Sequence, residues 1–352
     1  MSRRPLRIVH CISSAAFAGV ERHVALLAAG QAAAGHPVAV IGGEGRAMHA
    51  AFGGRNVLHR EASSVTEVIR ELAAFRHSDI VHAHMTAAEV AATVAPAVRS
   101  RPVVATRHFA QRRGMSRSGR LVAPVVARRL AAQIAISGYV AQAIDGPSTV
   151  VHPGVLDAPP VAPEDRRRTV LVVQRLEREK RTEDAIEVFA SSGLADQGWR
   201  LTIAGDGSQR RDLADLARRR GVGPVTDFLG HRRDVPALMR SAGLLLAPCD
   251  IEGLGLTVLE AMAEGLPVVA CAAGGHLETA GVAPGSALYP AGDLSRGAGL
   301  LCGLAADEQQ RRRYGQALRD IQRRRFTVEA QVAGTDAVYR SALGGDTGGV
   351  PA

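Results

Sequence analysis

Short apolar runs alternate with segments of helical spacing along most of this chain, and this pattern limits the possible folds more than any other feature. The runs read LRIVHCI, PVAVIGG, DIVHAHM, PVVATRH and AQIAIS in the first 150 residues, and TVLVVQRL, WRLTIAGDG, VTDFLG, GLLLAPC and PVVACAAGG after residue 168. Such runs are typical of buried strands in a parallel sheet. Strands that alternate with helices predict an α/β fold with doubly wound parallel sheets.

A proline-rich segment divides the alternation into two blocks. Residues 153–168 contain four prolines and have the composition of a linker. We therefore predict one Rossmann-like domain at 1–152 and a second at 169–326, joined by a linker at 153–168. The 352 residues are enough for two domains that each have a core of ordinary size.

The charge of the chain is distributed unevenly. Residues 1–150 hold 18 arginines and 8 acidic residues, so the net charge of +9 comes from the first domain. A basic half predicts an anionic partner, such as a phosphorylated acceptor, a membrane surface or nucleic acid. We expect no nucleic acid partner, because aromatic residues make up only 3% of the chain and no recognition motif is present.

Cysteine spacing and hydropathy indicate the compartment. Four scattered cysteines predict neither a disulfide framework nor a zinc site, which fits a reducing cytoplasm. The first twenty residues imitate a signal peptide, but His10, Ser13 and Ser14 interrupt the apolar part, so we expect a strand there. No apolar stretch reaches the roughly 18 residues that span a bilayer. We expect a cytoplasmic protein that could bind the inner face of the membrane peripherally.

Two cations follow the first strand of the second domain. Arg175 and Lys180 stand in VQRLEREKRTEDAIEVF, between a predicted strand and a predicted helix. Phosphates bind at this end of a strand in doubly wound folds. Lys180 is the only lysine of the chain, which suggests a site that requires an ammonium group. A solvated charge run with one chance lysine is the alternative.

The stretch EGLGLTVLE, residues 252–260, is a second candidate. Gly253 and Gly255 would let the backbone approach a ligand closely, and a helix that begins after them would offer N–H groups to an anion. Glu252 could contact the hydroxyls of a sugar, and Glu260 could accept two hydrogen bonds from a ribose diol. With the two cations, these groups describe a sugar nucleotide site. Ordinary solvated glutamates are the alternative for this stretch taken alone.

The first domain carries weaker signals. Gly19 opens the first predicted helix, so that amides there could face a phosphate. The motif HAH at 82–84 puts two imidazoles on one side of a strand, but no further ligands are evident, so we predict no metal. His108 ends a predicted strand and is either a structural residue or one that reaches a ligand.

An arginine-rich segment begins beside His108. Residues 107–120, RHFAQRRGMSRSGR, contain five arginines, and we expect them in one loop. Arg107, Arg112 and Arg113 are the candidates for contact with a phosphate, a carboxylate or an anionic membrane. A solvated basic loop is the alternative.

These motifs, in this order, resemble those of the retaining glycosyltransferases of family 4, which have the GT-B fold. The resemblance rests on GVERHV, DIVHAH, AISGYV, VHPGVLD, RLEREKRTEDAIEVF, LTIAGDG, FLG, PCDIEGLGLTVLEAMAEGLPVVA and FTVEAQVAGTDAVY, which are spread over nearly the whole chain. The most specific motif is the pair of Glu252 and Glu260 with seven residues between them. The resemblance implies an acceptor domain and a nucleotide-sugar domain that face a central cleft, with a final helix at about 327–343 that returns to the first domain.

The resemblance also implies a role for each matching residue. Arg175 and Lys180 should stabilise the leaving diphosphate, and Glu252 should hold the donor sugar, beside which His108 should lie. The other donor contacts that it implies are Gly19, Gly205, Leu229, Gly230, Gly253, Leu254, Gly255, Leu256 and Glu260.

The activity that the resemblance implies is metal-independent transfer of a sugar from a nucleotide diphosphate sugar, with retention at the anomeric carbon. A UDP- or GDP-hexose is the commoner donor, and no other cofactor is expected. The acceptor could be an anionic or membrane-associated glycolipid, a polysaccharide or a natural product. The alternatives are a sugar nucleotide epimerase of the same fold and a degenerate, non-enzymatic domain that binds a sugar nucleotide.

Overall fold

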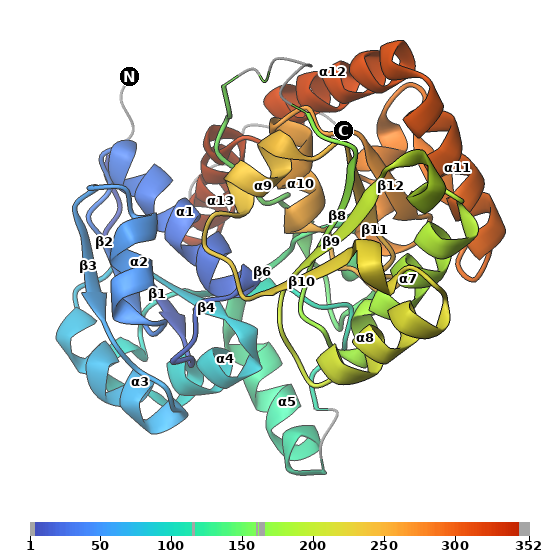
Figure 1. Cartoon of the computed structure of the whole chain (residues 1–352). Coiled ribbons are helices and arrows are strands. Elements are labelled where there is room, and N and C mark those ends of the chain that lie inside the picture. The colour runs from blue at the N-terminus through green and yellow to red at the C-terminus, as the bar shows by residue number, and fades with distance from the viewer. Residues whose placement is uncertain (1–3, 115–116, 160, 162–165, 345–352) are drawn as a thin grey trace. The chain divides into compact units, whose positions relative to one another are not determined.

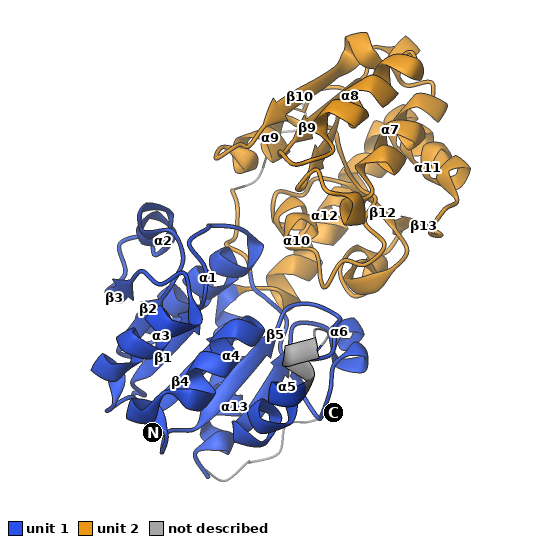
Figure 2. Cartoon of the chain, turned by 90° about the horizontal axis from the view of Figure 1, so that it is seen from below, with its two compact units in different colours: residues 1–154, 328–352 blue, residues 155–327 orange. Residues whose placement is uncertain are grey.

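In the computed structural model, which describes residues 4–114, 117–159, 161 and 166–344, the chain forms two compact units (Figure 2). Unit 1 comprises residues 1–154 and 328–352, and unit 2 comprises residues 155–327. Each unit is a parallel sheet with helices between its strands, as predicted for an α/β fold.

Unit 1 contains a seven-stranded sheet whose neighbouring strands all pair in parallel, in the order β3-β2-β1-β4-β5-β6-β7. Figure 1 labels five of these strands, β1 to β4 and β6. The strands are β1 (Ile8–Ile12), β2 (Val38–Ile41), β3 (Val57–Arg60), β4 (Ile80–His84), β5 (Val103–Arg107), β6 (Leu130–Ala135) and β7 (Thr149–Val150). The direction of strand order reverses between β1 and β4, and open α/β sheets bind ligands at such a switch point.

Helices cover both faces of this sheet. They are α1 (Gly19–Ala33), α2 (Gly45–Ala51), α3 (Val65–Leu72), α4 (Met85–Val94), α5 (Arg117–Arg129), α6 (Gly138–Ala143) and α13 (Val328–Ala342). Successive strand residues point to opposite faces, so that Val9 packs with residues of α3 and α4 while Ile8 packs with Tyr339 of α13.

The last helix, α13, therefore belongs to the core of unit 1 although it follows unit 2 in the sequence, which confirms the returning helix. Tyr339 is fully buried. Gly30 of α1 lies so close to α13 that an added Cβ would be 2.6 Å from Val328 Cγ1 and 2.8 Å from Val332 Cγ2. The absence of a side chain at Gly30 thus permits the two helices to approach each other.

Unit 2 contains a six-stranded parallel sheet in the order β10-β9-β8-β11-β12-β13. Its strands are β8 (Thr169–Val173), β9 (Arg200–Ala204), β10 (Thr226–Gly230), β11 (Leu244–Ala247), β12 (Val268–Cys271) and β13 (Ala287–Tyr289), and its helices are α7 (Thr182–Ser191), α8 (Arg210–Arg219), α9 (Val235–Ser241), α10 (Leu256–Ala263), α11 (Leu294–Ala306) and α12 (Glu308–Arg325). None of the helices in the described part of the chain has the length and apolar character that crossing a membrane requires.

Several elements differ from the sequence-based expectation. The segment 107–120 is not one loop, because α5 begins at Arg117 and includes Arg120. The strands β3, β7 and β13 were not predicted: β3 reads VLHR and is largely exposed, β7 has only two residues and β13 has only three. None of them produces the long apolar run on which the strand predictions relied.

We expect Gly30→Ala to lower the free energy of unfolding by about 1–2 kcal/mol, because overpacking costs about 1–3 kcal/mol and exceeds the gain in helix propensity. Gly299 of α11 is the matched control, since nothing lies within 4 Å of a Cβ added there. Gly299→Ala should raise the free energy of unfolding by up to about 1 kcal/mol. Denaturant unfolding followed by circular dichroism measures both, and equal stabilisation by the two substitutions would contradict the close approach.

Candidate functional site

The candidate donor residues of unit 2 lie in loops at one edge of its sheet. Arg175 follows β8, Gly205 follows β9, Leu229 and Gly230 end β10, and Glu252 follows β11. Because these strands are parallel, their carboxyl ends share one edge. The fold therefore gathers residues that are up to 77 positions apart in the sequence.

An ion pair joins two of these loops. Lys180 Nζ lies 2.7 Å from Glu252 Oε2, and the two side chains are 19% and 26% exposed. Burial alone would lower the pKa of Lys180, but the charge of Glu252 raises it above its ordinary value. Burial would raise the pKa of Glu252, but Lys180 lowers it below its ordinary value. Both groups are therefore charged at neutral pH.

The turn that carries Lys180 is fixed by neighbouring groups. The side-chain amide of Gln174 donates through Nε2 to the Lys180 carbonyl at 2.8 Å, and Cys249 Sγ donates to the Glu179 carbonyl at 3.3 Å. Arg175 is exposed and pairs with Glu179 at 2.7 Å. The positive charge of Arg175 also acts to lower the pKa of Lys180, although less than burial does.

Glycines allow the loops of this edge to approach closely. A Cβ at Gly205 would lie 1.8 Å from the carbonyl oxygen of Gln174, so only glycine fits beside the end of β8. The amide of Gly205 donates to the Gly230 carbonyl at 2.8 Å. Gly230 has a φ of +67°, in the left-handed region that favours glycine.

The turn before α10 packs on a second glycine pair that the sequence analysis did not identify. A Cβ at Gly274 would lie 2.4 Å from the Glu252 carbonyl oxygen, and one at Gly275 would lie 2.2 Å from Leu254 Cα. The amide of Gly275 donates to the Glu252 carbonyl at 2.9 Å. The segment CAAGGH after β12 carries two adjacent glycines, which were the available signal for such contact. This pair holds the backbone of Glu252.

The remaining predicted donor residues belong to the same turn and helix. Gly253, Leu254 and Gly255 are buried, and Gly255 caps α10 with a φ of +90°. Leu256 begins α10, and the half-buried Glu260 lies one turn further. The predicted loop and helix are confirmed, whereas the contacts of these residues with a donor stay a prediction.

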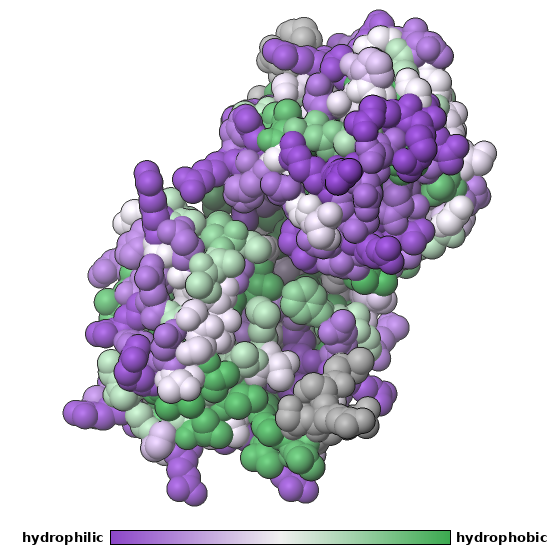
Figure 3. All heavy atoms as spheres, turned by 60° about the horizontal axis from the view of Figure 1, so that its bottom comes forward, coloured by the Kyte–Doolittle hydropathy of each residue, from purple (hydrophilic) through white to green (hydrophobic). Residues whose placement is uncertain are grey.

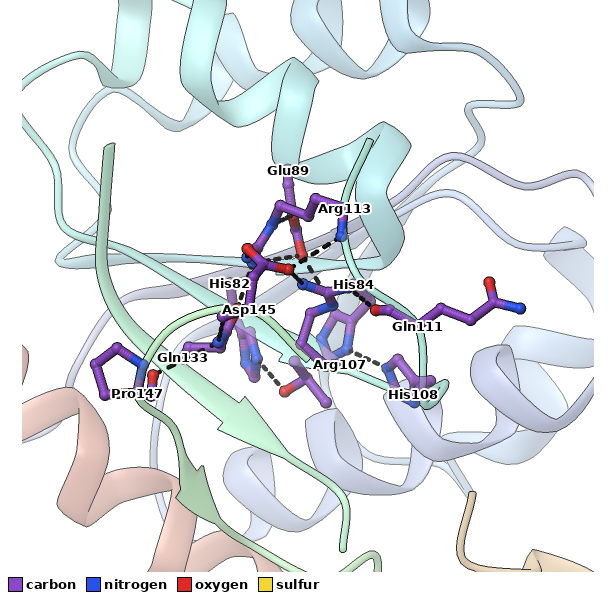
Figure 4. A network of polar contacts seen from close by, with 11 residues as sticks. His82, His84, Glu89, Arg107, His108, Gln111, Arg113, Gln133, Asp145 and Pro147 are labelled. Carbon is purple, nitrogen blue, oxygen red and sulfur yellow. Dashed lines mark hydrogen bonds and ion pairs between the residues drawn. The ribbon is translucent and has the colours of Figure 1, made fainter. Parts of the chain in front are cut away.

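Histidines form a buried hydrogen-bonded chain in unit 1, part of which Figure 4 shows. His108 Nε2 lies 3.2 Å from His84 Nδ1, and His84 Nε2 lies 3.0 Å from His10 Nδ1. The chain ends where His10 Nε2 meets Gln31 Oε1 at 2.7 Å. His10 and His84 face each other because β1 and β4 are adjacent in the sheet.

Burial fixes the charge and the tautomers of this chain. It lowers the pKa of His10 to about 4, and burial together with Arg107 lowers that of His108 to about 3. A neutral imidazole has one donor and one acceptor nitrogen. Because Gln31 Oε1 only accepts, His10 and then His84 and His108 each donate through Nε2. His108 Nδ1 is therefore left as the hydrogen-bond acceptor at the end of the chain.

Two overlapping sets of buried histidines lie close enough to hold a metal ion, which corrects the expectation that His82 and His84 lack further ligands. The sets are His10, His82 and His84, and His23, His84 and His108. His82 already bonds to Tyr339 at 2.6 Å and to Thr106 at 2.7 Å. The hydrogen-bonded chain explains the proximity of His10, His84 and His108 without an ion.

The two described non-glycine residues with positive φ each follow a residue of these clusters. Arg181, with a φ of +54°, follows Lys180, and Met85, with a φ of +70°, follows His84. Such backbone conformations are costly and gather at functional sites. The sequence offered no signal for the conformations of Arg181 and Met85.

Gly19, which was predicted to open a helix whose amides could face a phosphate, is exposed at the start of α1 in unit 1.

Comparisons with known proteins agree with this arrangement. The model of the Glycosyltransferase Family 4 matches residues 17–157, and the model of the Glycosyl transferases group 1 matches residues 157–320. The chain belongs to the family 4 glycosyltransferases. The structure of HepE from Anabaena, in complex with UDP and glucose, has the same GT-B fold, with a TM-score of 0.80 at 20% identity over 96% of this chain and 100% of that one.

Two curated relatives show how far the sequence similarity extends. A glycogen synthase of Mycobacterium tuberculosis is 40% identical over 108 residues, which are 30% of this chain and 26% of that protein. The lipopolysaccharide core biosynthesis mannosyltransferase LpsB of Rhizobium meliloti is 27% identical over 238 residues, which are 61% of this chain and 67% of that protein. The matches to the first curated relatives thus span about a quarter to half of their length.

Two of the arginines considered for acceptor binding have internal partners in this glycosyltransferase (Figure 4). Arg113 pairs with Glu89 at 2.5 Å and with Asp145 at 2.6 Å, and Arg107 pairs with Asp145 at 3.2 Å. Burial would raise the pKa of Asp145, but Arg113 lowers it to about 2. The alternative of a solvated basic loop is therefore wrong for Arg107 and Arg113, which are buried, whereas Arg112 is exposed. Contact of these arginines with an acceptor stays a prediction.

We expect Arg113→Ala to lower the free energy of unfolding by about 3–5 kcal/mol, because it leaves buried Glu89 without its main partner. Arg112→Ala is the neighbouring control and should change it by less than about 0.5 kcal/mol. Denaturant unfolding distinguishes the two. Similar small effects of both substitutions would show that the Arg113 network contributes little.

The buried histidines should make stability depend on pH. The folded-state pKa of His10 is below the unfolded value, so this contribution is complete above about pH 6.5 and decreases as pH falls toward about 4. One such group changes the free energy of unfolding by up to about 1.4 kcal/mol per pH unit. We expect His10→Asn to reduce this slope in unfolding titrations between pH 7 and 4.5. The exposed His77 is the control, and His77→Asn should leave the slope intact.

Proposed function

We propose that this family 4 glycosyltransferase transfers a sugar from a nucleotide diphosphate sugar, bound at the carboxyl edge of the unit 2 sheet, to an acceptor hydroxyl. The observation that carries the proposal is the charged pair of Lys180 and Glu252, beside the glycine turn that begins α10. UDP-sugars are the first donors to test, because HepE was solved with UDP and glucose.

The ion pair suggests how a donor would be received. A diphosphate is a stronger anion than one carboxylate, so it would draw Lys180 away from Glu252 and toward the phosphate oxygens. Glu252 would then be free to accept hydrogen bonds from the donor sugar. Its lowered pKa supports the role of a hydroxyl-binding carboxylate rather than that of a general acid. Glu260 would hold the ribose diol.

The same charges support departure of the diphosphate without a metal ion. Lys180 and the nearby Arg175 would neutralise the negative charge that develops on the leaving oxygen. We propose retention at the anomeric carbon, with the acceptor attacking from the face that the diphosphate leaves. A double displacement needs a carboxylate nucleophile at the reacting carbon, and we assign Glu252 to the hydroxyls of the donor sugar instead.

In unit 1, we propose that His108 contacts a hydroxyl of the transferred sugar. Its Nδ1 atom accepts hydrogen bonds, and the chain through His84 and His10 keeps it in that tautomer. His108 is uncharged at physiological pH, because burial lowers its pKa to about 3. It would therefore orient the sugar without adding charge.

Peripheral membrane contact is a further part of the proposal. Helix α5 exposes Leu121 by 81% and Val125 by 56%, and Arg128 on the same helix is also exposed. Figure 3 shows a hydrophobic area on the surface of unit 1. Apolar side chains beside arginines are typical of helices that lie on anionic membranes. The acceptor would then be a lipid-linked or other membrane-associated molecule.

Thermal shift against UDP-, GDP-, ADP- and dTDP-sugars tests the donor site. One nucleotide class should raise the melting temperature by mass action, and Lys180→Ala and Glu260→Ala should each abolish the shift. Lys180→Ala should also lower kcat by about 10²–10³-fold, as expected for the loss of one group that stabilises developing charge.

Arg178 provides the control, because it is exposed in the same turn as Lys180. Arg178→Ala should retain the shift. Unchanged shifts in the Lys180 and Glu260 variants would overturn the site, and donor turnover without any acceptor would favour the epimerase.

Vesicle co-sedimentation tests the membrane contact. We expect binding to phosphatidylglycerol vesicles that falls at least tenfold in Leu121→Asp/Val125→Asp. Val94, which is 54% exposed on α4, is the control site, and Val94→Asp should bind as the native chain does. Equal binding by all three proteins would exclude α5 as the contact.

A further inference from the structure

A cavity of about 680 Å³ lies at the other edge of the unit 2 sheet. Its walls come from residues that directly precede β8, β9, β11 and β12, and from the adjoining ends of α11 and α12. The amino ends of parallel strands lie at the edge opposite their carboxyl ends. The cavity is thus separate from the edge that carries Lys180 and Glu252.

The described wall of the cavity is strongly basic. It includes six arginines, namely Arg166, Arg167, Arg168, Arg311, Arg312 and Arg319. Its described acidic residues are Glu264 and Glu308. Burial lowers the pKa of Arg311; the charges of Glu308 and Asp307 act to raise it, and those of Arg168 and Arg312 act to lower it. The positive charge therefore exceeds what the described acidic groups of the wall compensate.

Two buried polar groups of the wall lack a hydrogen-bond partner among the described residues. They are Nε of Arg319 and Oε2 of Glu264, and each residue is only 5% exposed. Buried groups without a partner are rare in proteins. Both atoms have almost no accessible surface, so the side chains would first have to turn toward the cavity. An anionic oxygen of an occupant would then accept from Arg319, and a hydroxyl would donate to Glu264.

The arginines divide into groups that shape the wall and groups that remain available. Four of the arginines donate to backbone carbonyls. Arg166 donates to those of Met239 and Ala242, and Arg311 to that of Leu304. Arg168 donates to the carbonyl of Gln197, and Arg319 donates through Nη2 to that of Ala158. The side chain of Arg167, in contrast, makes no hydrogen bond or ion pair that the structure shows with a described residue. Arg312 is exposed and pairs with Glu308 within the first turns of α12. Both can turn toward an anion.

The aromatic residue of the wall helps to define the ligand. Trp199 is only 4% exposed, and the guanidinium of Arg311 lies over its ring at 5.7 Å from the centroid. The wall therefore offers little indole surface for stacking a nucleotide base. The volume lies within the range of about 300–1,000 Å³ that is typical of small-molecule sites and exceeds what one phosphate ion needs.

We propose that this cavity is a second ligand site that binds a phosphorylated sugar, with the phosphate held by Arg167, Arg312 and Arg319 and a sugar hydroxyl donated to Glu264. The site would act apart from the transfer reaction, because it lies at the opposite edge of the sheet. Its existence does not depend on which donor or acceptor the enzyme uses.

Isothermal titration calorimetry of the full chain tests the site, with glucose 1-phosphate, glucose 6-phosphate, glucose and inorganic phosphate as probes. At least one sugar phosphate should bind at least tenfold more tightly than glucose and than phosphate. Arg167→Ala/Arg312→Ala should weaken that binding at least tenfold. Arg313→Ala is the matched control, because Arg313 is an exposed neighbour on α12 that does not line the cavity, and it should leave binding unchanged.

Three further outcomes decide the matter. Retention of binding in Lys180→Ala would support a site distinct from the donor site, whereas its loss would overturn the assignment to this cavity. Failure of both sugar phosphates to bind the native chain would overturn the proposal. Phosphate that binds as tightly as the sugar phosphates would overturn the role of Glu264 in holding a hydroxyl.

Discussion

Parallel pairing of strands is the constraint on which the rest of each unit depends. It brings loops from distant parts of the sequence to one edge, and it sends the chain back through a helix after most strands. In unit 2 this places Lys180 beside Glu252, while in unit 1 it brings His84 next to His10 and His108. The chemistry of both units follows from these encounters, since none of the residues concerned is adjacent to its partner in the sequence.

Much of this could be predicted from the sequence, and the failures have identifiable causes. The position of Lys180 at the end of a strand and the loop-then-helix geometry of Glu252 and Glu260 follow from local patterns. The ion pair itself does not, because it joins loops 72 residues apart. Likewise, Gly274 and Gly275 gain their importance only from the backbone that packs on them. The local sequence pattern thus shows on which helix, strand or loop a residue lies. Which other residues it contacts depends on tertiary structure.

Charge was the least reliable guide to surface function. The arginine count of the first half suggested an exposed anion-binding loop, but Arg107 and Arg113 neutralise buried Glu89 and the adjacent Asp145 instead. The half of the chain that is nearly neutral overall carries an arginine-lined cavity, because its acidic residues lie mostly elsewhere. Net charge is a sum over all positions of a segment, whereas the fold places its basic and acidic side chains in different parts of the molecule.

The contribution of α13 to unit 1 has a consequence for how the protein is made. Tyr339 fills the core and bonds to His82, yet it is synthesised after all of unit 2. On the ribosome, one face of the unit 1 sheet stays incompletely covered until α13 is synthesised. Unit 2 is a continuous segment and can fold before that point. Apolar strands of unit 1 are therefore exposed for an extended time during synthesis. We expect a chaperone to bind the nascent chain until α13 has been synthesised.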